Sequence, residues 1–220
     1  MVVMADKSVP TSDHIRDIIS FVEASPTSYH AVAELTRRLE QAGFQRLEET
    51  ESWPSVEGRR YVVRDGAVIA WITPEKVTPQ LGARIVGSHT DSPSFKLKPN
   101  ATVTNQGWQQ VGMEVYGGGL LNSWLDRDLG LSGRLVTCDG QAHLVRTGPI
   151  LRISQLAPHL DRTVNDDLKL DRQRHLMPIL SVGKPDLDVE DLLCEAAGIK
   201  RDELAFHDAV SYTHLRAHET

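Results

Sequence analysis

The stretch IVGSHTDSPSFKLKPN, residues 85–100, begins as a short apolar strand and continues into small, polar and turn-forming residues. His89 and Asp91 stand one residue apart directly after this apolar start. Side chains alternate along an extended segment, so the His89 imidazole and the Asp91 carboxylate are expected on the same side. Sites in open α/β sheets gather at the carboxyl ends of strands, which is where this pair falls.

Two interpretations fit the pair. A neutral imidazole can bind zinc through one ring nitrogen while a carboxylate holds its other N–H and fixes its orientation. His89 is then a metal ligand, and Asp91 supports it without ligating. The alternative is an ordinary surface or loop histidine, because a His-x-Asp triplet is common by chance. The spacing alone does not decide between them.

The residues before the pair predict two helices. Apolar residues at i, i+3, i+4 and i+7 predict an amphipathic helix over 15–22, capped by Thr11 or Ser12. A second helix is predicted to begin at Thr27 or Ser28, with Ala31, Val32, Leu35 and Leu39 facing inward, and to end before Gly43.

Three strands are predicted to follow these helices. Residues 59–73 read as a hairpin around Asp65–Gly66, and residues 83–89 (ARIVGSH) read as a third, apolar strand. Two helices followed by such strands indicate an α/β layer that needs further chain to be complete.

Beyond residue 100 the sequence is rich in Thr, Val and Gly, with frequent turn signals, so we predict a mainly β region and a domain boundary near residue 100. One short acidic helix, with Leu192, Leu193, Ala196 and Ala197, is expected to end at Gly198. The end, HDAVSYTHLRAHET, shows neither a helical period nor a convincing strand and is interpreted as a loose tail.

The composition restricts the class of protein. A net charge of -6 and a pI near 5.8, without a block of basic residues, give no electrostatic reason to expect nucleic acid or an anionic membrane as partner. The sequence lacks a secretory signal pattern and any apolar run of about 20 residues, so we expect a cytoplasmic protein. Cys138 and Cys194 are too few and too isolated for a disulfide framework.

Four separated segments carry a resemblance to a known family. They are SPTSYHAV (25–32), SHTDSPSFKLKPN (88–100), EVYGGGLLNSWLDRDLGLSGRL (114–135), and LAPHLDR with HLMPIL (156–180). In this order they resemble the aspartyl aminopeptidase family of zinc metallopeptidases, over about residues 15–209. Agreement at four separated places is improbable by chance.

The resemblance implies an α/β fold: a partial α/β/α catalytic domain over residues 1–100, followed by a β-rich inserted oligomerisation domain over 101–209, with 210–220 an unassigned, artefact-like tail. It implies a homo-oligomeric hydrolase that removes N-terminal Asp or Glu from peptides with two Zn²⁺ ions per complete site. In such a site zinc polarises the scissile carbonyl and lowers the pKa of a bridging water, while a glutamate moves the proton.

The resemblance also implies roles for individual residues. His89 is a zinc ligand, Asp91 is the catalytic-site residue that orients it, and His159, in a segment where Pro158 departs from the usual aliphatic residue, reaches the active site of a partner subunit and is a candidate metal ligand. The family's remaining ligands and its glutamate base lie downstream of this chain. A catalytic zinc usually takes three protein ligands, so we expect this polypeptide to be inactive alone. The alternative is a non-catalytic oligomerisation module.

Other candidates receive weaker roles. His30 is interpreted as structural, and His214 and His218 receive no function. The glycines of YGGG are expected to allow tight turns or close packing rather than to bind phosphate. Lys96 and Lys98 either attract an acidic substrate or form a solvated strand edge. The triplet 126–128 is either an interface pair or a solvated turn.

Overall fold

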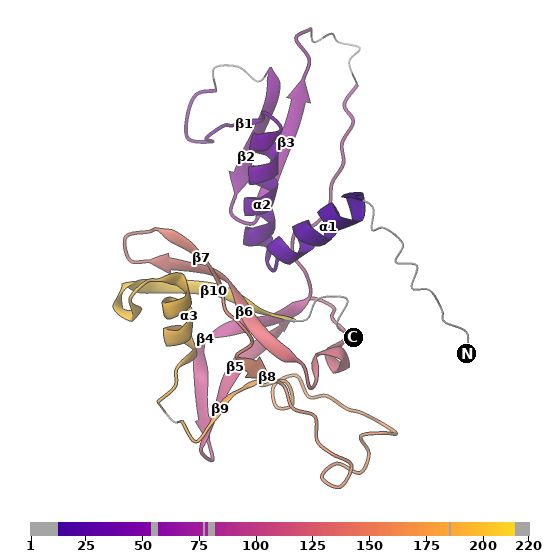
Figure 1. Cartoon of the computed structure of the whole chain (residues 1–220), viewed down its shortest axis with the longest axis vertical. Coiled ribbons are helices and arrows are strands. Elements are labelled where there is room, and N and C mark those ends of the chain that lie inside the picture. The colour runs from indigo at the N-terminus through magenta and orange to yellow at the C-terminus, as the bar shows by residue number, and fades with distance from the viewer. Residues whose placement is uncertain (1–12, 54–56, 77, 79–81, 185, 214–220) are drawn as a thin grey trace, which may run out of the picture. The chain divides into compact units, whose positions relative to one another are not determined.

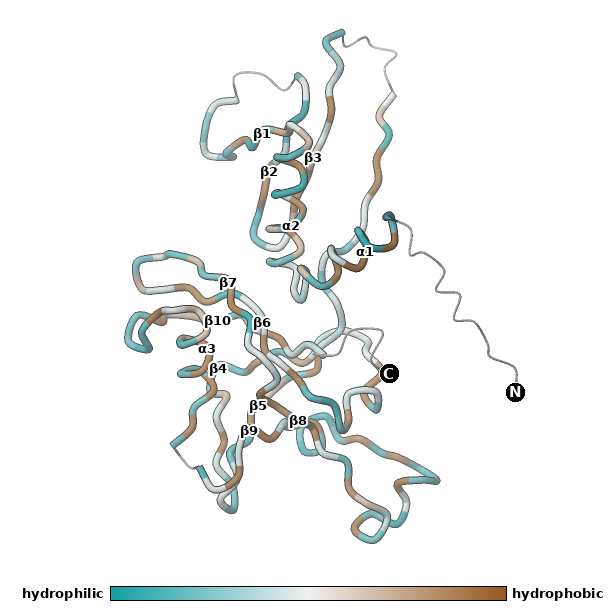
Figure 2. The backbone as a smooth tube through the Cα atoms, viewed as in Figure 1, coloured by the Kyte–Doolittle hydropathy of each residue, from teal (hydrophilic) through white to brown (hydrophobic). Residues whose placement is uncertain are grey.

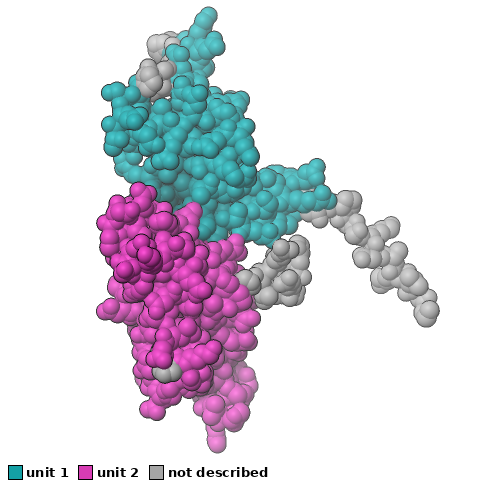
Figure 3. All heavy atoms as spheres, turned by 60° about the vertical axis from the view of Figure 1, so that its left-hand side comes forward, with its two compact units in different colours: residues 1–90 teal, residues 91–220 magenta. Residues whose placement is uncertain are grey.

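The structure, a computed structural model, describes residues 13–53, 57–76, 78, 82–184 and 186–213. The chain forms two compact units, residues 1–90 and 91–220 (Figure 3). The sequence placed a boundary near residue 100, but strand β4 (Ser94–Asn105) runs through that position. The turn-forming residues there lie at an irregularity of the β4–β5 register, between Leu97 and Thr102. The change in amino-acid composition therefore falls inside a strand.

The first unit contains two helices and a small sheet (Figure 1). The sheet order is β1-β2-β3, with β1 parallel to β2 and β2 antiparallel to β3. The strands of the predicted hairpin are confirmed as β2 and β3, and Asp65 in their turn has a φ of 50°. The bounds of the elements are α1 Asp13–Ala24, α2 Ser28–Gln41, β1 Gln45–Arg46, β2 Gly58–Arg64 and β3 Ala67–Thr73.

Helix α2 forms as its sequence predicts. The Thr27 hydroxyl caps it by accepting a hydrogen bond from the His30 backbone N–H at 3.3 Å. Ala31 and Val32 are buried. Gly43 follows the helix with a φ of +80°, a conformation that glycine adopts without strain. The helix therefore supplies one side of the small core of this unit.

Helix α1 forms as predicted, but its apolar face is not buried. Ile15, Ile18 and Val22 are exposed, and no residue of α1 is buried. An amphipathic period predicts a helix, whereas burial also needs a neighbouring element over the apolar face. Thr11 and Ser12, the predicted caps, lie outside the described residues.

The third strand predicted over residues 83–89 is wrong. Residues 82–90 are extended but belong to neither a strand nor a helix, and Ile85 and Val86 are 89% and 98% exposed. Figure 2 shows a hydrophobic stretch in this connection between β3 and β4. A strand exists only when another strand pairs with it, and none of the described strands pairs with these residues.

The second unit is a β-sheet that closes on itself (Figure 1). Its strand order is β10-β4-β5-β9-β8-β6-β7, and an additional pairing of β10 with β6 joins the two ends of a six-stranded ring, leaving β7 as an extension. Closure pairs each of the six ring strands with two neighbours, which protects strand edges that would otherwise favour aggregation, whereas β7 is paired on one side only. The strands are β4 Ser94–Asn105, β5 Trp108–Tyr116, β6 Asp128–Thr137, β7 Ala142–Arg146, β8 Leu151–Arg152, β9 Ile179–Val182 and β10 Leu204–Thr213.

A single apolar core fills the second unit. Its fully buried members include Phe95, Val111, Leu129, Leu131 and Leu135 from the strands, and Val189 and Leu193 from helix α3 (Val189–Ala197). Short 3₁₀ turns lie at η1 (Leu121–Trp124) and η2 (Arg201–Glu203).

Helix α3 has a clear beginning and end. The Asp188 side chain accepts hydrogen bonds from the backbone N–H groups of Glu190 and Asp191, and Gly198 ends the helix in the left-handed conformation. The predicted short acidic helix is confirmed, as is the glycine that ends it. Cys138 and Cys194 are both free, as expected.

The interpretation of the chain end as lacking a strand is wrong for residues up to Thr213. Strand β10 pairs with β6 from Phe206↔Val136 to Thr213↔Leu129. Within it, Ser211 and Tyr212 are buried, and the Tyr212 hydroxyl donates a hydrogen bond to the Thr147 carbonyl. Long-range pairing makes this strand, and no local period announces it. His214 and His218 lie outside the described residues.

Candidate metal-site residues

His89 lies near the end of the extended segment in the first unit, and its side chain is exposed. The next residue anchors the segment, because the Thr90 hydroxyl donates a hydrogen bond of 2.6 Å to the Gly66 carbonyl in the β2–β3 turn. His89 itself lies outside the described strands. Its predicted role as a metal ligand stays a prediction.

Asp91 begins the second unit and is half-buried. Its Oδ2 accepts a hydrogen bond of 2.6 Å from the hydroxyl of Tyr116, the last residue of β5. This hydrogen bond, together with the negative charge of Asp91, raises the pKa of the Tyr116 phenol. Tyr116 is a contact that the spacing of the sequence did not reveal, because the two residues are 25 positions apart.

The YGGG segment, residues 116–119, packs against Pro93, two residues after Asp91. A Cβ at Gly117 would lie 3.3 Å from the Pro93 Cα, and a Cβ at Gly119 would lie 3.3 Å from the Pro93 Cβ. Gly117 also has a φ of +74°. The expectation that these glycines allow close packing is confirmed.

His159 lies in an exposed turn of the long connection between β8 and β9. The Ala157 carbonyl closes this turn by accepting hydrogen bonds from the backbone N–H groups of Leu160 and Asp161. The connection extends away from the sheet of its own unit (Figure 1). The leucines on either side of the turn, Leu156 and Leu160, are also exposed.

These residues alone do not make a complete zinc site. Among the residues that the structure describes, no group of three or more His, Cys, Asp or Glu side chains could hold a metal ion. A catalytic zinc needs about three protein ligands. The donor set of the described chain therefore does not fit a complete catalytic zinc centre.

Other charged groups have partners within their own unit. Lys96 lies 2.9 Å from Asp208, and Lys98 lies 2.9 Å from Glu114. Lys98 also donates a hydrogen bond to Gln173. Both lysines thus serve the β domain, which weakens the interpretation that they attract an acidic substrate.

In the predicted charged triplet, Asp126 lies in a turn, whereas Asp128 is the first residue of β6. Asp126 has a φ of 55°, and Asp128 pairs with Arg152 at 3.1 Å. Arg152 also donates a hydrogen bond to the Asp126 carbonyl. These contacts lie within one chain, and the interface role of the triplet stays a prediction.

A buried titratable group outside the motifs ties α3 to β10. His207 Nε2 lies 3.2 Å from Glu190, both side chains are largely buried, and Arg201 pairs with the same carboxylate. Burial is the main reason that the pKa of His207 is lowered. The arrangement is a structural link between the helix and the strand.

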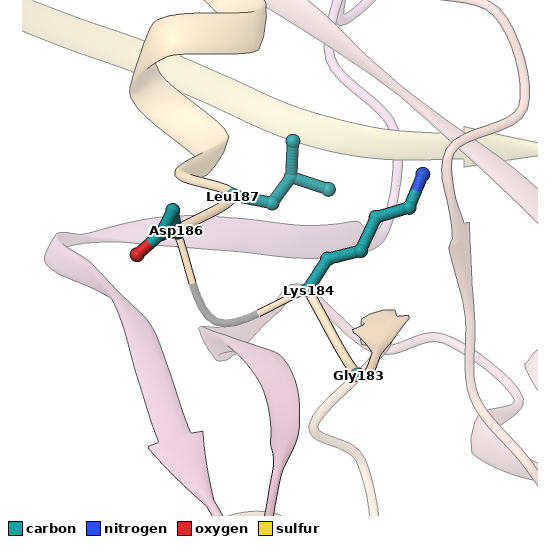
Figure 4. A pocket seen from close by; sticks show the side chains of 4 residues that line it. All are labelled: Gly183, Lys184, Asp186 and Leu187. Carbon is teal, nitrogen blue, oxygen red and sulfur yellow. The ribbon is translucent and has the colours of Figure 1, made fainter.

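A shallow hollow lies beside the loop that precedes α3 and is lined by Gly183, Lys184, Asp186 and Leu187 (Figure 4). The Lys184 and Asp186 side chains extend in opposite directions. None of the predicted site residues lines it. In the described chain, every helix is too short or too polar to cross a bilayer.

Comparison with known proteins places the motifs in one family. Residues 21–211 match the sequence profile described as "Aminopeptidase I zinc metalloprotease (M18)". The chain is 49% identical over 204 residues to a "Probable M18 family aminopeptidase 2" of Streptomyces avermitilis, a match that covers 91% of this chain and 47% of that protein. The chain thus spans about half the length of the curated relatives that it matches.

The fold is shared with solved structures. A chain from the cryo-EM structure of the Ape4 and Nbr1 complex is 30% identical, with a TM-score of 0.84 over 91% of this chain and 44% of that chain. A chain from the structure of the S. cerevisiae mApe1 dodecamer is 26% identical to this chain. Its TM-score is 0.76, and the match covers 93% of this chain and 49% of that chain.

Proposed function

The chain belongs to the M18 family of zinc aminopeptidases, and from this premise we propose that it carries the N-terminal part of a peptidase that removes acidic residues from the amino end of peptides. The observation that supports the proposal is the match over residues 21–211, which includes His89, Asp91 and His159. The resemblance deduced from the four sequence motifs is confirmed at the level of the family. The preference for Asp or Glu belongs to the proposal.

We assign His89 as a zinc ligand and Asp91 as the carboxylate that orients it. Two zinc ions per complete site remain the expectation. Because the described residues do not form a group of three ligands, we propose that the 220-residue chain alone lacks hydrolytic activity. Completing the site requires metal ligands in addition to those of the described residues. The partial α/β/α domain over residues 1–100 is part of the same proposal.

We further propose that the β-rich region over residues 101–209 assembles into a homo-oligomer in the cytoplasm. Two observations support assembly: the exposed turn at His159 between Leu156 and Leu160, and the dodecamer formed by the related mApe1. In such an assembly His159 reaches the site of a neighbouring subunit, as a metal ligand or as a contact to substrate.

Zinc content and peptidase activity test the proposal together. The purified chain, loaded with Zn²⁺ and desalted, is analysed for bound metal and assayed with glutamyl and aspartyl p-nitroanilides, with leucyl p-nitroanilide as the specificity control. We expect less than one zinc per chain and no turnover above that of His89→Ala. Stoichiometric zinc with turnover that His89→Ala abolishes would refute the proposed inactivity.

Light scattering on the same samples, together with NMR of the His89 ring, tests the alternative function. A stable oligomer in which added Zn²⁺ does not shift the His89 ring signals would favour a non-catalytic oligomerisation module. A zinc response at His89, with or without assembly, would favour the peptidase interpretation.

A further inference from the structure

Two motifs that lie far apart in the sequence meet at Asp91. The hydrogen bond from the Tyr116 hydroxyl to Asp91 Oδ2, at 2.6 Å, has the length of a charge-assisted O–H···O⁻ bond. Such bonds are roughly twice as strong as those between neutral groups and are directional. A carboxylate is planar, so holding one oxygen in place fixes where the other oxygen points.

The sheet fixes the donor of this hydrogen bond. Tyr116 is the Cα partner of Ser94 in the antiparallel β4–β5 ladder. Ser94 begins β4 only three residues after Asp91. The backbone of Tyr116 is therefore held by strand pairing close to the segment whose carboxylate its phenol contacts.

Glycines and an aromatic pair hold the rest of the segment. A Cβ at Gly117 or Gly119 would lie 3.3 Å from Pro93, so Pro93 would have to shift by a few tenths of an ångström to accept it. One residue beyond Ser94, Phe95 is 1% exposed and packs edge-on against Trp124, with ring centroids 5.0 Å apart. An aromatic pair in this geometry adds specific stabilisation to the burial of the rings. The segment after Asp91 is thus fixed at both Pro93 and Phe95.

We propose that Tyr116, with Gly117 and Gly119, forms a clamp that positions the Asp91 carboxylate. Tyr116 is a positioning residue and acts only through Asp91. The purpose of the clamp rests on the proposed function, in which Asp91 orients the His89 imidazole. The glycines set the distance between the YGGG segment and Pro93, and the phenol sets the rotation of the carboxylate.

NMR spectroscopy of the whole chain tests the clamp through the side-chain rotamer of Asp91. Three-bond couplings across χ1 report whether that side chain occupies one rotamer or several. We expect a single rotamer in the wild-type chain and averaged couplings in Tyr116→Phe. Gly117→Ala, which forces a Cβ toward Pro93 at a φ of +74°, should produce the same averaging while Tyr116 is still present. Unchanged amide resonances elsewhere in the second unit establish that both variants fold.

Tyr61→Phe is the matched control. The Tyr61 hydroxyl donates a 2.6 Å hydrogen bond to the Glu40 carboxylate in the first unit, so this variant removes the same type of bond at a different place. We expect the Asp91 couplings to stay at their wild-type values. A single Asp91 rotamer in Tyr116→Phe, or averaging in Tyr61→Phe as well, overturns the clamp.

Zn²⁺ alone, titrated into the same samples, separates the clamp from the proposed function. In the wild-type chain we expect the His89 ring nitrogens to respond. In Tyr116→Phe the apparent affinity for Zn²⁺ should fall about threefold to tenfold, because this variant loses the hydrogen bond to Asp91, the residue that orients the ligand His89. An unchanged affinity in Tyr116→Phe overturns the clamp's role at His89. No response of His89 in the wild type overturns the proposed function, and the Asp91 couplings still decide whether the clamp exists.

Discussion

Replacing Gly133 by alanine should break the contact that closes the β ring. A Cβ at Gly133 would lie 2.2 Å from the Asp208 carbonyl oxygen and 2.5 Å from the Ala209 Cα, both of them backbone atoms of β10. Ordinary contact begins near 3.4 Å, so β6 and β10 would have to separate by about 1 Å. Backbone hydrogen bonds stretched by that amount are largely lost.

The magnitude follows from the two effects together. Overpacking in a closed core costs about 1–3 kcal/mol, and two weakened ladder hydrogen bonds cost about 1 kcal/mol each. We therefore expect Gly133→Ala to lower the free energy of unfolding of the second unit by about 3–5 kcal/mol. A domain is stable by only about 5–15 kcal/mol, so β10 should open readily.

Urea denaturation and hydrogen exchange measure this effect. The amides of β10 and of the facing part of β6 should lose protection first. Gly148→Ala is the matched control, because a Cβ there would meet no atom within 4 Å. A midpoint for Gly133→Ala that equals that of Gly148→Ala, with β10 still protected, would refute the reasoning.

Two further predictions concern helix α2 and helix α3. Hydrogen bonds from Arg37 and Arg38 lower the pKa of Glu34 to about 2 from its ordinary 4.5, so this pairing stabilises the first unit above pH 4.5 and its contribution, about 1 kcal/mol, is lost as the pH falls from 4.5 toward 2. Thermal unfolding measured across that pH range should show a smaller change in Glu34→Gln, and an equal change would contradict the assignment. Asp188→Ala should cost about 1 kcal/mol by removing the cap of α3, while Asp188→Asn should keep most of it; equal losses in urea denaturation would exclude capping as the cause.

Local patterns predicted the local structure of this chain. Capping residues and apolar spacing identified α2 and α3, and Asp65–Gly66 identified the β2–β3 hairpin. Each of these signals acts between residues that are close in sequence. The family resemblance, which depends on several separated motifs together, identified the family where the His-x-Asp spacing alone did not.

Long-range contacts could not be deduced in the same way. The apolar residues around Val86 indicate a segment suited to a sheet, but pairing depends on a strand that the local sequence does not specify. Strand β10 forms because β6 pairs with it, and Tyr116 reaches Asp91 because β5 folds back on β4. Both contacts join residues far apart in the chain, so spacing rules do not reveal them.

The exposed stretch at residues 82–90 has a consequence for the behaviour of the chain in a cell. Ile85 and Val86 present apolar side chains on extended backbone, and the neighbouring strand β3 is a sheet edge with Ile69 and Ile72 also exposed. Unpaired extended backbone of this kind pairs with other chains and is readily cut by proteases. We therefore expect chaperones and proteases to affect the concentration of intact chain, in addition to the stability of its closed β ring.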